Sequence, residues 1–306
     1  MVQADPDAAV EVMLSNDAGL WLIDAEAEPT SLGPGGHADL VIADLDGDAD
    51  EDAVGVRIDE RGIVALEVLA RGPAGYTVVA NLEGTPTPAA VGDLDGDGDE
   101  ELFAVAAQRD AFAVSVLLAD GPALLADATP LVDGLDLPYL AVGRFDDDDA
   151  ADVAGHVPGR TRVWRGPDAA IHDGDGNVLD FLPTPPSLGL FFVPFAGDGE
   201  WALLSAHASA SETTVAVLSF DAHAIALPIV ATLAVAADLE GDGVHELLLT
   251  GGGSLGVVAG GEPECIAVTQ IDVEPTAFAV GDVDGDGLVD LVLTHDAGVA
   301  MLRGRP

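Results

Sequence analysis

The sequence predicts an all-β fold, a seven-bladed β-propeller of four-stranded antiparallel blades, in a single domain that spans residues 1–306. Three observations favour this fold. A short acidic motif recurs along the chain, with copies that begin near residues 44, 93, 144, 194, 238 and 282. The copies lie 44 to 51 residues apart, a period typical of propellers and solenoids. The runs between the copies are short and apolar, and no segment has a convincing helical stripe.

The repeat that begins at residue 44 shows how four strands fit into one period. Apolar runs at 53–56, 63–69 and 76–80 follow the acidic motif, and a fourth run at 89–92 leads into the next copy. Turn residues separate these runs. Four short strands, apolar enough to be buried between neighbours, describe a propeller blade.

The number of blades depends on residues 1–36, which hold strand-like runs but no complete acidic motif. Residues 9–20 parallel residues 288–299, and Val2-Gln-Ala-Asp5 is similar to Val41-Ile-Ala-Asp44. These similarities favour a first blade with a shortened loop, and seven blades in total. If the N-terminal strands instead complete the last blade, the alternative is a six-bladed propeller.

The acidic motif has the composition of a calcium loop. In Asp282-Val-Asp-Gly-Asp-Gly-Leu-Val-Asp290, carboxylates stand at positions 1, 3, 5 and 9, and a glycine at position 6 permits a sharp bend. Ca²⁺ takes six to eight oxygen ligands, and alternate residues of a tight turn can supply several of them. Because strands flank the loop on both sides, the motif is not an EF-hand.

Four copies of the motif are intact, so we expect about four bound Ca²⁺ ions; the open alternative is an acidic turn without metal. Position 7 should contribute a backbone carbonyl, which leaves its side chain free to vary. The predicted ligands are Asp44, Asp46, Asp48, Asp50 and Asp52; Asp93, Asp95, Asp97, Asp99 and Glu101; Asp238, Glu240, Asp242, Val244 and Glu246; and Asp282, Asp284, Asp286, Leu288 and Asp290.

Two further copies are damaged. Arg144 replaces the first acid of the third copy, and its guanidinium could either take the place of the metal or point away from a weakened site. The copy at Pro194 keeps only Asp198 of the ligand set, so we expect no metal there and local packing of Phe195 and Trp201.

Composition narrows the possible partners. A net charge of −45, with ten basic residues that are all arginine, argues against nucleic acid and anionic membranes as partners. No apolar run is long enough to span a membrane, and Cys265 is the only cysteine, so no disulfide forms within the chain.

The chain is expected to be a monomer. Low-affinity calcium loops are typical of extracellular modules, which favours a secreted or cell-surface location with a leader not present in this chain.

At the end of the strand before two of the motifs, Ala90-Val-Gly-Asp93 and Ala279-Val-Gly-Asp282 complete a longer pattern. With it, the repeats resemble FG-GAP/VCBS repeats, the calcium-binding blades of integrin α-subunit propellers and of many bacterial surface proteins. The resemblance implies that each loop joins the innermost strand of a blade to the next strand and that each intact loop holds one Ca²⁺.

No catalytic constellation is evident, so the sequence predicts no enzyme. The seven histidines are scattered, and Gly251-Gly-Gly-Ser254 fits a hairpin turn better than a phosphate cradle. The expected function is a structural or recognition module that binds protein or glycan, for example in cell adhesion. The alternative is a polysaccharide hydrolase or lyase, because the same fold hosts enzymes.

Overall fold

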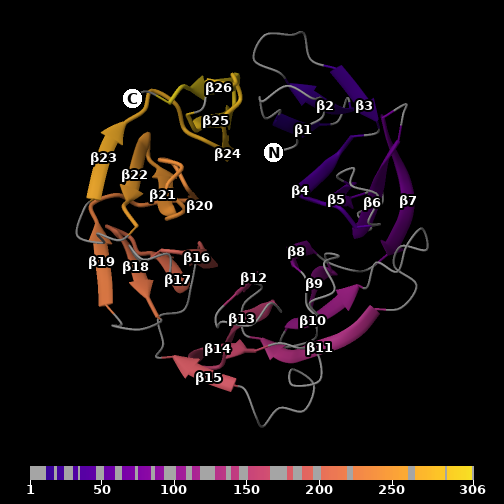
Figure 1. The fold of residues 1–306 in the computed structure, drawn as a ribbon, viewed down its shortest axis with the longest axis horizontal. Coiled ribbons are helices and arrows are strands. Elements are labelled where there is room, and N and C mark those ends of the chain that lie inside the picture. The colour runs from indigo at the N-terminus through magenta and orange to yellow at the C-terminus, as the bar shows by residue number, and fades with distance from the viewer. Residues whose placement is uncertain are drawn as a thin grey trace. The chain divides into compact units, whose positions relative to one another are not determined.

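The computed structural model describes residues 12–16, 19–23, 30–33, 35–45, 52–58, 64–72, 75–83, 87–92, 101–107, 112–117, 128–135, 139–144, 151–165, 178–181, 188–195, 201–218, 223–260, 266–286 and 288–304. Every regular element within these ranges is a β-strand, which confirms the all-β class (Figure 1). No helix in the described ranges is long and apolar enough to cross a membrane.

The chain divides into two compact units, whose main parts are Met13–Asp180 and Phe181–Pro306. In the first unit, a three-stranded sheet precedes three four-stranded sheets. The strands of the first unit are β1 (Val12–Asn16), β2 (Gly19–Ile23) and β3 (Thr30–Gly33); β4 (His37–Ala43), β5 (Asp52–Ile58), β6 (Val64–Gly72) and β7 (Gly75–Glu83); β8 (Thr87–Gly92), β9 (Glu101–Ala107), β10 (Phe112–Leu117) and β11 (Ala128–Leu135); and β12 (Leu140–Gly143), β13 (Asp152–Val157), β14 (Arg160–Trp164) and β15 (Val178–Phe181).

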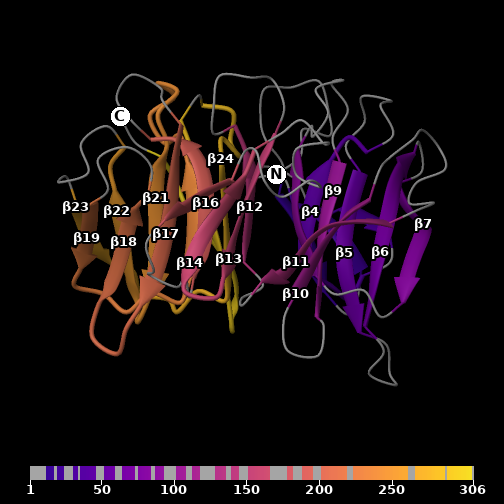
Figure 2. The ribbon, with the colours of Figure 1, turned by 90° about the horizontal axis from the view of Figure 1, so that it is seen from below.

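In the second unit, two four-stranded sheets precede a three-stranded one. The strands of the second unit are β16 (Gly189–Pro194), β17 (Trp201–Ala208), β18 (Thr213–Val217) and β19 (His223–Leu227); β20 (Leu233–Ala237), β21 (Glu246–Gly251), β22 (Ser254–Val258) and β23 (Ile266–Gln270); and β24 (Ala277–Gly281), β25 (Asp290–His295) and β26 (Gly298–Leu302). Within each sheet, strands adjacent in sequence pair antiparallel, as the side view of Figure 2 shows for β16 to β18.

The prediction of seven four-stranded blades is wrong, and so is the six-bladed alternative. The described residues form five four-stranded blades, whereas β1–β3 and β24–β26 are three-stranded sheets. The reason lies in the spacing of the motif. A blade takes one strand before its loop and three after it, and this needs a full period of 44 to 51 residues. The six motifs are separated by five such periods, and each period provides one four-stranded blade.

Neighbouring sheets of each unit meet along their first strands. In the first unit β4 lies beside β8 and β8 beside β12; in the second, β16 lies beside β20 and β20 beside β24. Burial differs between the strands of one sheet. All residues of β21, the second strand of its blade, are buried, while all residues of β23, the outermost strand, are exposed. A strand buried on both faces needs a continuous apolar run, which the sequence provides.

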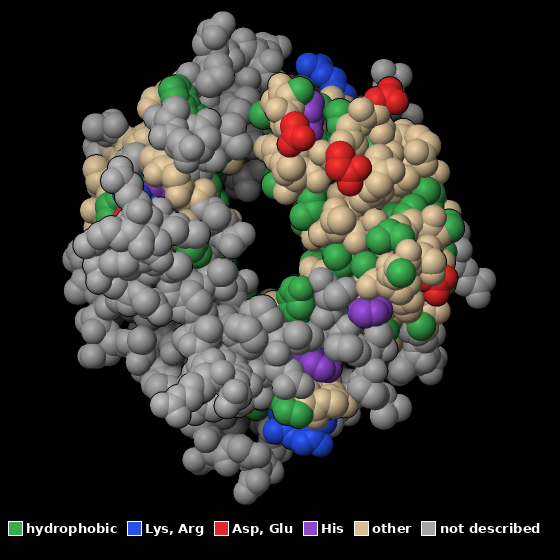
Figure 3. All heavy atoms as spheres, turned by 180° about the vertical axis from the view of Figure 1, so that it is seen from behind, with side chains coloured by type: hydrophobic (Ala, Val, Ile, Leu, Met, Phe, Trp, Pro, Cys, Tyr) green, Lys and Arg blue, Asp and Glu red, His purple; other side chains and the backbone are tan. Residues whose placement is uncertain are grey.

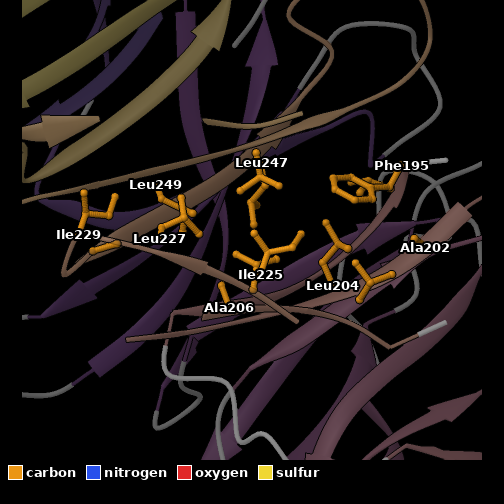
Figure 4. Packing of buried hydrophobic residues seen from close by; sticks show 14 residues of the cluster. Phe195, Ala202, Leu204, Ala206, Ile225, Leu227, Ile229, Leu247 and Leu249 are labelled. Carbon is orange, nitrogen blue, oxygen red and sulfur yellow. The ribbon is translucent and has the colours of Figure 1, made fainter. Parts of the chain in front are cut away.

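The main core of the second unit lies between its first two sheets. Leu204 of β17 and Leu227 of β19 face Leu247 and Leu249 of β21, and all four side chains are fully buried (Figure 4). Phe195, from the damaged motif, belongs to the same cluster at 4% exposure, which confirms the expected local packing of this residue. Sheet-on-sheet burial of aliphatic side chains therefore supplies much of the stability of this unit.

A polar network surrounds a buried carboxylate in the second sheet of the first unit. The carboxylate of Glu67 contacts Nε2 of His37 at 2.9 Å and Nη1 of Arg57 at 3.4 Å, and it accepts a hydrogen bond from Nδ2 of Asn81 at 3.2 Å. The side chains of His37 and Glu67 are 0% and 7% exposed. A buried carboxylate is tolerated here because three partners on three strands satisfy it.

Candidate metal-binding loops

Each acidic motif joins the first strand of a sheet to the second, as the resemblance implied. The acid at position 9 is the first residue of the second strand, so it belongs to the sheet rather than to the loop. This holds for Asp52 of β5, Glu101 of β9, Asp152 of β13, Glu246 of β21 and Asp290 of β25.

The Asp238 loop is organised by its first acid. Oδ1 of Asp238 accepts hydrogen bonds from the amides of Gly241 and Asp242 at 2.7 and 3.1 Å, and Oδ2 accepts one from Gly243 at 2.8 Å. Gly241 and Gly243 have φ angles of 71° and 86°, in the left-handed region that favours glycine. The glycine at position 6 therefore makes the bend that the sequence predicted.

The Asp282 loop repeats this arrangement. Oδ1 of Asp282 accepts the amide of Asp286 at 3.0 Å, and Oδ1 of Asp286 accepts the amide of Leu288 at 2.9 Å. The matching contact in the other loop joins Oδ1 of Asp242 to the amide of Val244 at 2.8 Å. Both loops thus hold their carboxylates in place through bonds to their own backbone.

The position-9 acid has a structural role that the sequence did not indicate. Asp290 is 1% exposed; its Oδ2 accepts the amide of Val283 at 3.1 Å, and its Oδ1 accepts the amide of Gly304, just beyond β26, at 2.8 Å. Glu246 accepts the amide of Leu239 at 2.9 Å in the same way. Through these hydrogen bonds the carboxylate of Asp290 connects the loop to the end of β26, the third strand of its sheet.

Charges in the Asp238 loop alter each other's ionisation. Burial alone raises the pKa of Asp238, but the amides of Gly243, Gly241 and Asp242 outweigh this effect, so the pKa of Asp238 lies below its usual value. Burial raises the pKa of Glu246, and the nearby carboxylates of Glu240 and Asp238 raise it further. Glu246 therefore lies in a position where an added cation relieves an unfavourable charge.

The Asp282 loop brings three acids together. Asp282, Asp284 and Asp290 each offer a carboxylate oxygen within 4.8 Å of the others, and they form the one such group of three in the described part of the chain. The Asp284 side chain is 9% exposed, and its Oδ2 lies 2.7 Å from Nη1 of Arg303. Among the described residues, no group donates a hydrogen bond to its buried Oδ1.

These residues fit a hard divalent cation. The donor set consists of carboxylate oxygens, which Ca²⁺ and Mg²⁺ prefer, and it includes no nitrogen or sulfur ligand of the kind that zinc sites use. A buried acceptor without a donor is costly unless a cation satisfies it. Asp282, Asp284 and Asp290 are the residues that would hold such an ion.

The structure describes only some of the other predicted ligands. Asp46, Asp48, Asp50, Asp93, Asp95, Asp97 and Asp99 lie outside the described residues, and of Glu101 only the backbone is described. Asp52 is 1% exposed, and its Oδ1 accepts the amide of Arg71 at 2.9 Å. Glu240 and Asp242 are exposed, as is Asp286. Arg144 is exposed, and the loop that follows it lies outside the described ranges.

Acidic side chains are spread over the molecular surface in Figure 3. Those of the described residues lie as separate spots on the face that this view presents.

Comparison with known proteins identifies the fold. No protein-family model matches the chain, and no curated protein matches it. Among solved structures, the chain is similar to BBS1N in complex with ARL6DN, with 12% identity, a TM-score of 0.64, and coverage of 98% of this chain and 88% of that one. The chain has a β-propeller fold.

Two further structures share this fold. One is an Agrocybe aegerita lectin that recognises non-reducing terminal N-acetylglucosamine, with 15% identity, a TM-score of 0.62, and coverage of 99% of this chain and 92% of the lectin. The other is a functionally unknown protein from Desulfotomaculum acetoxidans, with 12% identity, a TM-score of 0.55, and coverage of 96% and 99%. Identities this low show a common fold and no more.

Proposed function

We propose that this chain is a calcium-binding β-propeller that acts as a recognition module for protein or glycan. The observation that carries the calcium assignment is the Asp282 loop. Three carboxylates converge there, and a buried oxygen of Asp284 has no donor among the described residues. Ca²⁺ suits the site better than Mg²⁺, because Mg²⁺ demands strict octahedral geometry and dehydrates reluctantly.

In this proposal the ion has a structural task. A bound cation supplies the positive charge that offsets the mutual repulsion of Asp282, Asp284 and Asp290. Hydrogen bonds within the loop position these carboxylates. Asp290, the position-9 acid, also accepts the amide of Gly304 and so connects the loop to the end of β26. Ion binding thereby stabilises the connection between β24 and β25, and stability rises with free Ca²⁺ above the dissociation constant. The four intact motifs give about four ions per chain.

Recognition is proposed from the fold and the surface. The similar structures include a lectin that recognises a sugar and BBS1N in complex with ARL6DN. The loops repeat from sheet to sheet, so they suit a scaffold role, and the ligand would bind elsewhere on the surface. A secreted or cell-surface location accords with loops of low calcium affinity, because free Ca²⁺ is millimolar outside cells.

A chelator experiment tests the calcium assignment. We expect EDTA to lower the melting temperature of the full chain and excess CaCl₂ to restore it. Isothermal titration calorimetry should show that Asp284→Ala binds about one ion fewer than the wild type, whereas Asp296→Ala, at an exposed acid in the turn after β25, binds the full number. A melting temperature unchanged by EDTA, with no calorimetric binding, would refute the proposal.

The recognition role needs a separate experiment. A glycan array probed with the calcium-loaded chain should give binding to a defined set of glycans, or none if the ligand is a protein. The same polysaccharides are then incubated with the chain and analysed for chain shortening. Cleavage would replace the recognition module with the hydrolase or lyase alternative.

A further inference from the structure

The acid cluster of the Asp282 loop already has a cationic neighbour from its own chain. Nη1 of Arg303 lies 2.7 Å from Oδ2 of Asp284, the position-3 carboxylate. The arginine side chain is 57% exposed, while that of Asp284 is 9% exposed. The guanidinium therefore approaches the loop from the solvent side, and it can leave into water without disturbing the core.

Strand register places the arginine there. Leu291 pairs with Leu302, so the next residue, Arg303, lies opposite the position-9 acid Asp290. Gly304 follows and donates its amide to Asp290. A Cβ at Gly304 would lie 2.7 Å from the carbonyl oxygen of Val289, so the backbone passes directly against the loop. The end of β26 thus presents Arg303 to the carboxylates.

The Asp238 loop has the same backbone arrangement, but no arginine stands at the corresponding position. Leu247 pairs with Val258, and Ala259 takes the place of Arg303. A Cβ at Gly260 would lie 2.4 Å from the carbonyl oxygen of His245, which stands at the same loop position as Val289. At this position the two loops share the backbone arrangement and differ in the side chain, which is arginine in one and alanine in the other.

We propose that Arg303 is a built-in competitor for the metal, so that the Asp282 loop binds Ca²⁺ more weakly than it would with a neutral residue there. The inference rests on the proposed calcium-binding function. An ion that enters this loop must displace the guanidinium from Oδ2 of Asp284 or share that oxygen with a like charge. Either case makes the free energy of calcium binding less favourable. The Asp238 loop, with Ala259, carries no such competitor.

The pattern extends to one damaged motif. Val153 pairs with Trp164, so Arg165 takes the place of Arg303 beside the Arg144 loop. In the first loop the pairing of Ala53 with Leu69 puts Ala70 there. Among the described residues, this position therefore holds an arginine beside two loops and an alanine beside two others, which implies that calcium fills the Asp44 and Asp238 loops before the Asp282 loop.

Calorimetry with CaCl₂ on the full chain tests the inference. Asp284→Ala removes a ligand, so the binding event that it abolishes is that of the Asp282 loop. We expect Arg303→Gln to tighten calcium binding at the Asp282 loop by about twofold to fivefold, the range for an exposed ion pair, and to leave the other binding events unchanged. In the reverse exchange, Ala259→Arg should weaken the event of the Asp238 loop by a similar factor.

Two controls separate the explanations. Arg160→Gln removes the same charge from the exposed first residue of β14, which lies at the opposite end of β13 from the Arg144 loop, so it should leave all calcium affinities unchanged. Combining Arg303→Gln with Asp284→Ala should give the same titration as Asp284→Ala alone, because Arg303 then has no carboxylate to compete for.

The possible failures are distinguishable. If neither the wild type nor Arg303→Gln binds Ca²⁺, the proposed function itself is wrong. If Ca²⁺ binds but Arg303→Gln leaves the affinity of this loop unchanged or weakens it, the competitor role is overturned while calcium binding stands. An equal effect of Arg160→Gln would also overturn it, because the cause would then be overall charge.

Discussion

The position-9 carboxylate should stabilise the fold even without metal, and Asp290→Ala measures this. The substitution removes the acceptor for two amides, that of Val283, which is buried, and that of Gly304, which is partly buried. A buried amide without a partner costs about 1–3 kcal/mol, and one that water can reach costs about 1 kcal/mol. Loss of one of three neighbouring carboxylates relieves about 1 kcal/mol of repulsion. The net loss of unfolding free energy in EDTA is therefore about 1–3 kcal/mol.

Urea denaturation in EDTA, followed by circular dichroism and tryptophan fluorescence, gives this value directly. Asp284→Ala is the matched comparison, because Asp284 contacts no backbone amide among the described residues and pairs only with the exposed Arg303. It should change stability in EDTA by less than about 1 kcal/mol. In CaCl₂ at about a hundred times the dissociation constant, both variants should lose about a further 2.7 kcal/mol relative to the wild type.

Two results would refute this reasoning. If Asp290→Ala is as stable as the wild type in EDTA, then the hydrogen bonds to the two amides contribute nothing to stability. The carboxylate would then act only as a metal ligand. If Asp284→Ala destabilises the metal-free chain as much as Asp290→Ala does, then the two positions do not have the separate roles that the hydrogen bonds assign to them.

Three further predictions concern the scaffold. Leu204→Ala, at a fully buried position of the second unit's core, should cost about 2–5 kcal/mol in urea denaturation, whereas Val268→Ala on exposed β23 should change stability by less than about 0.5 kcal/mol. Glu67→Ala removes this acceptor from the buried ring of His37 and from two exposed partners, Arg57 and Asn81, and should cost about 3 kcal/mol equally in EDTA and in CaCl₂; a cost that depends on calcium would contradict the place of Glu67 outside the loops. Gly251→Ala places a Cβ 2.2 Å from the carbonyl oxygen of Val230, so it should cost about 3 kcal/mol, seen as a lower melting temperature.

The sequence was sufficient to predict the loops and their flanking strands. The carboxylate spacing placed Asp282 to Asp290 between two strands, and a glycine with positive φ makes the bend in the Asp238 loop as expected. The hairpin at Gly252 and Gly253, also with positive φ, joins β21 to β22 as predicted. These features are local, and local chemistry determines them.

The role of the position-9 acid and the place of Arg303 could not be predicted in the same way. Both depend on the pairing of β25 with β26, and Gly304 lies 14 residues after Asp290 in the chain. A signal was nevertheless present, because a glycine stands 14 residues after Asp152, Glu246 and Asp290 alike. The blade count was wrong for a different reason. Sequence similarity of residues 9–20 to the last repeat shows related strands, and it does not show that a fourth strand completes each sheet.

The hydrogen bonds inside the Asp282 loop have a consequence for the rate of ion exchange. Since Asp282 and Asp286 are already held by backbone amides, an arriving cation finds its ligands gathered and does not wait for a chain segment to fold. Once the exposed guanidinium of Arg303 has left Asp284, the rate of exchange would depend on how quickly the ion loses its hydration water. Ca²⁺ gives up water readily and Mg²⁺ reluctantly, so the loop would select between the two ions by speed as well as by affinity.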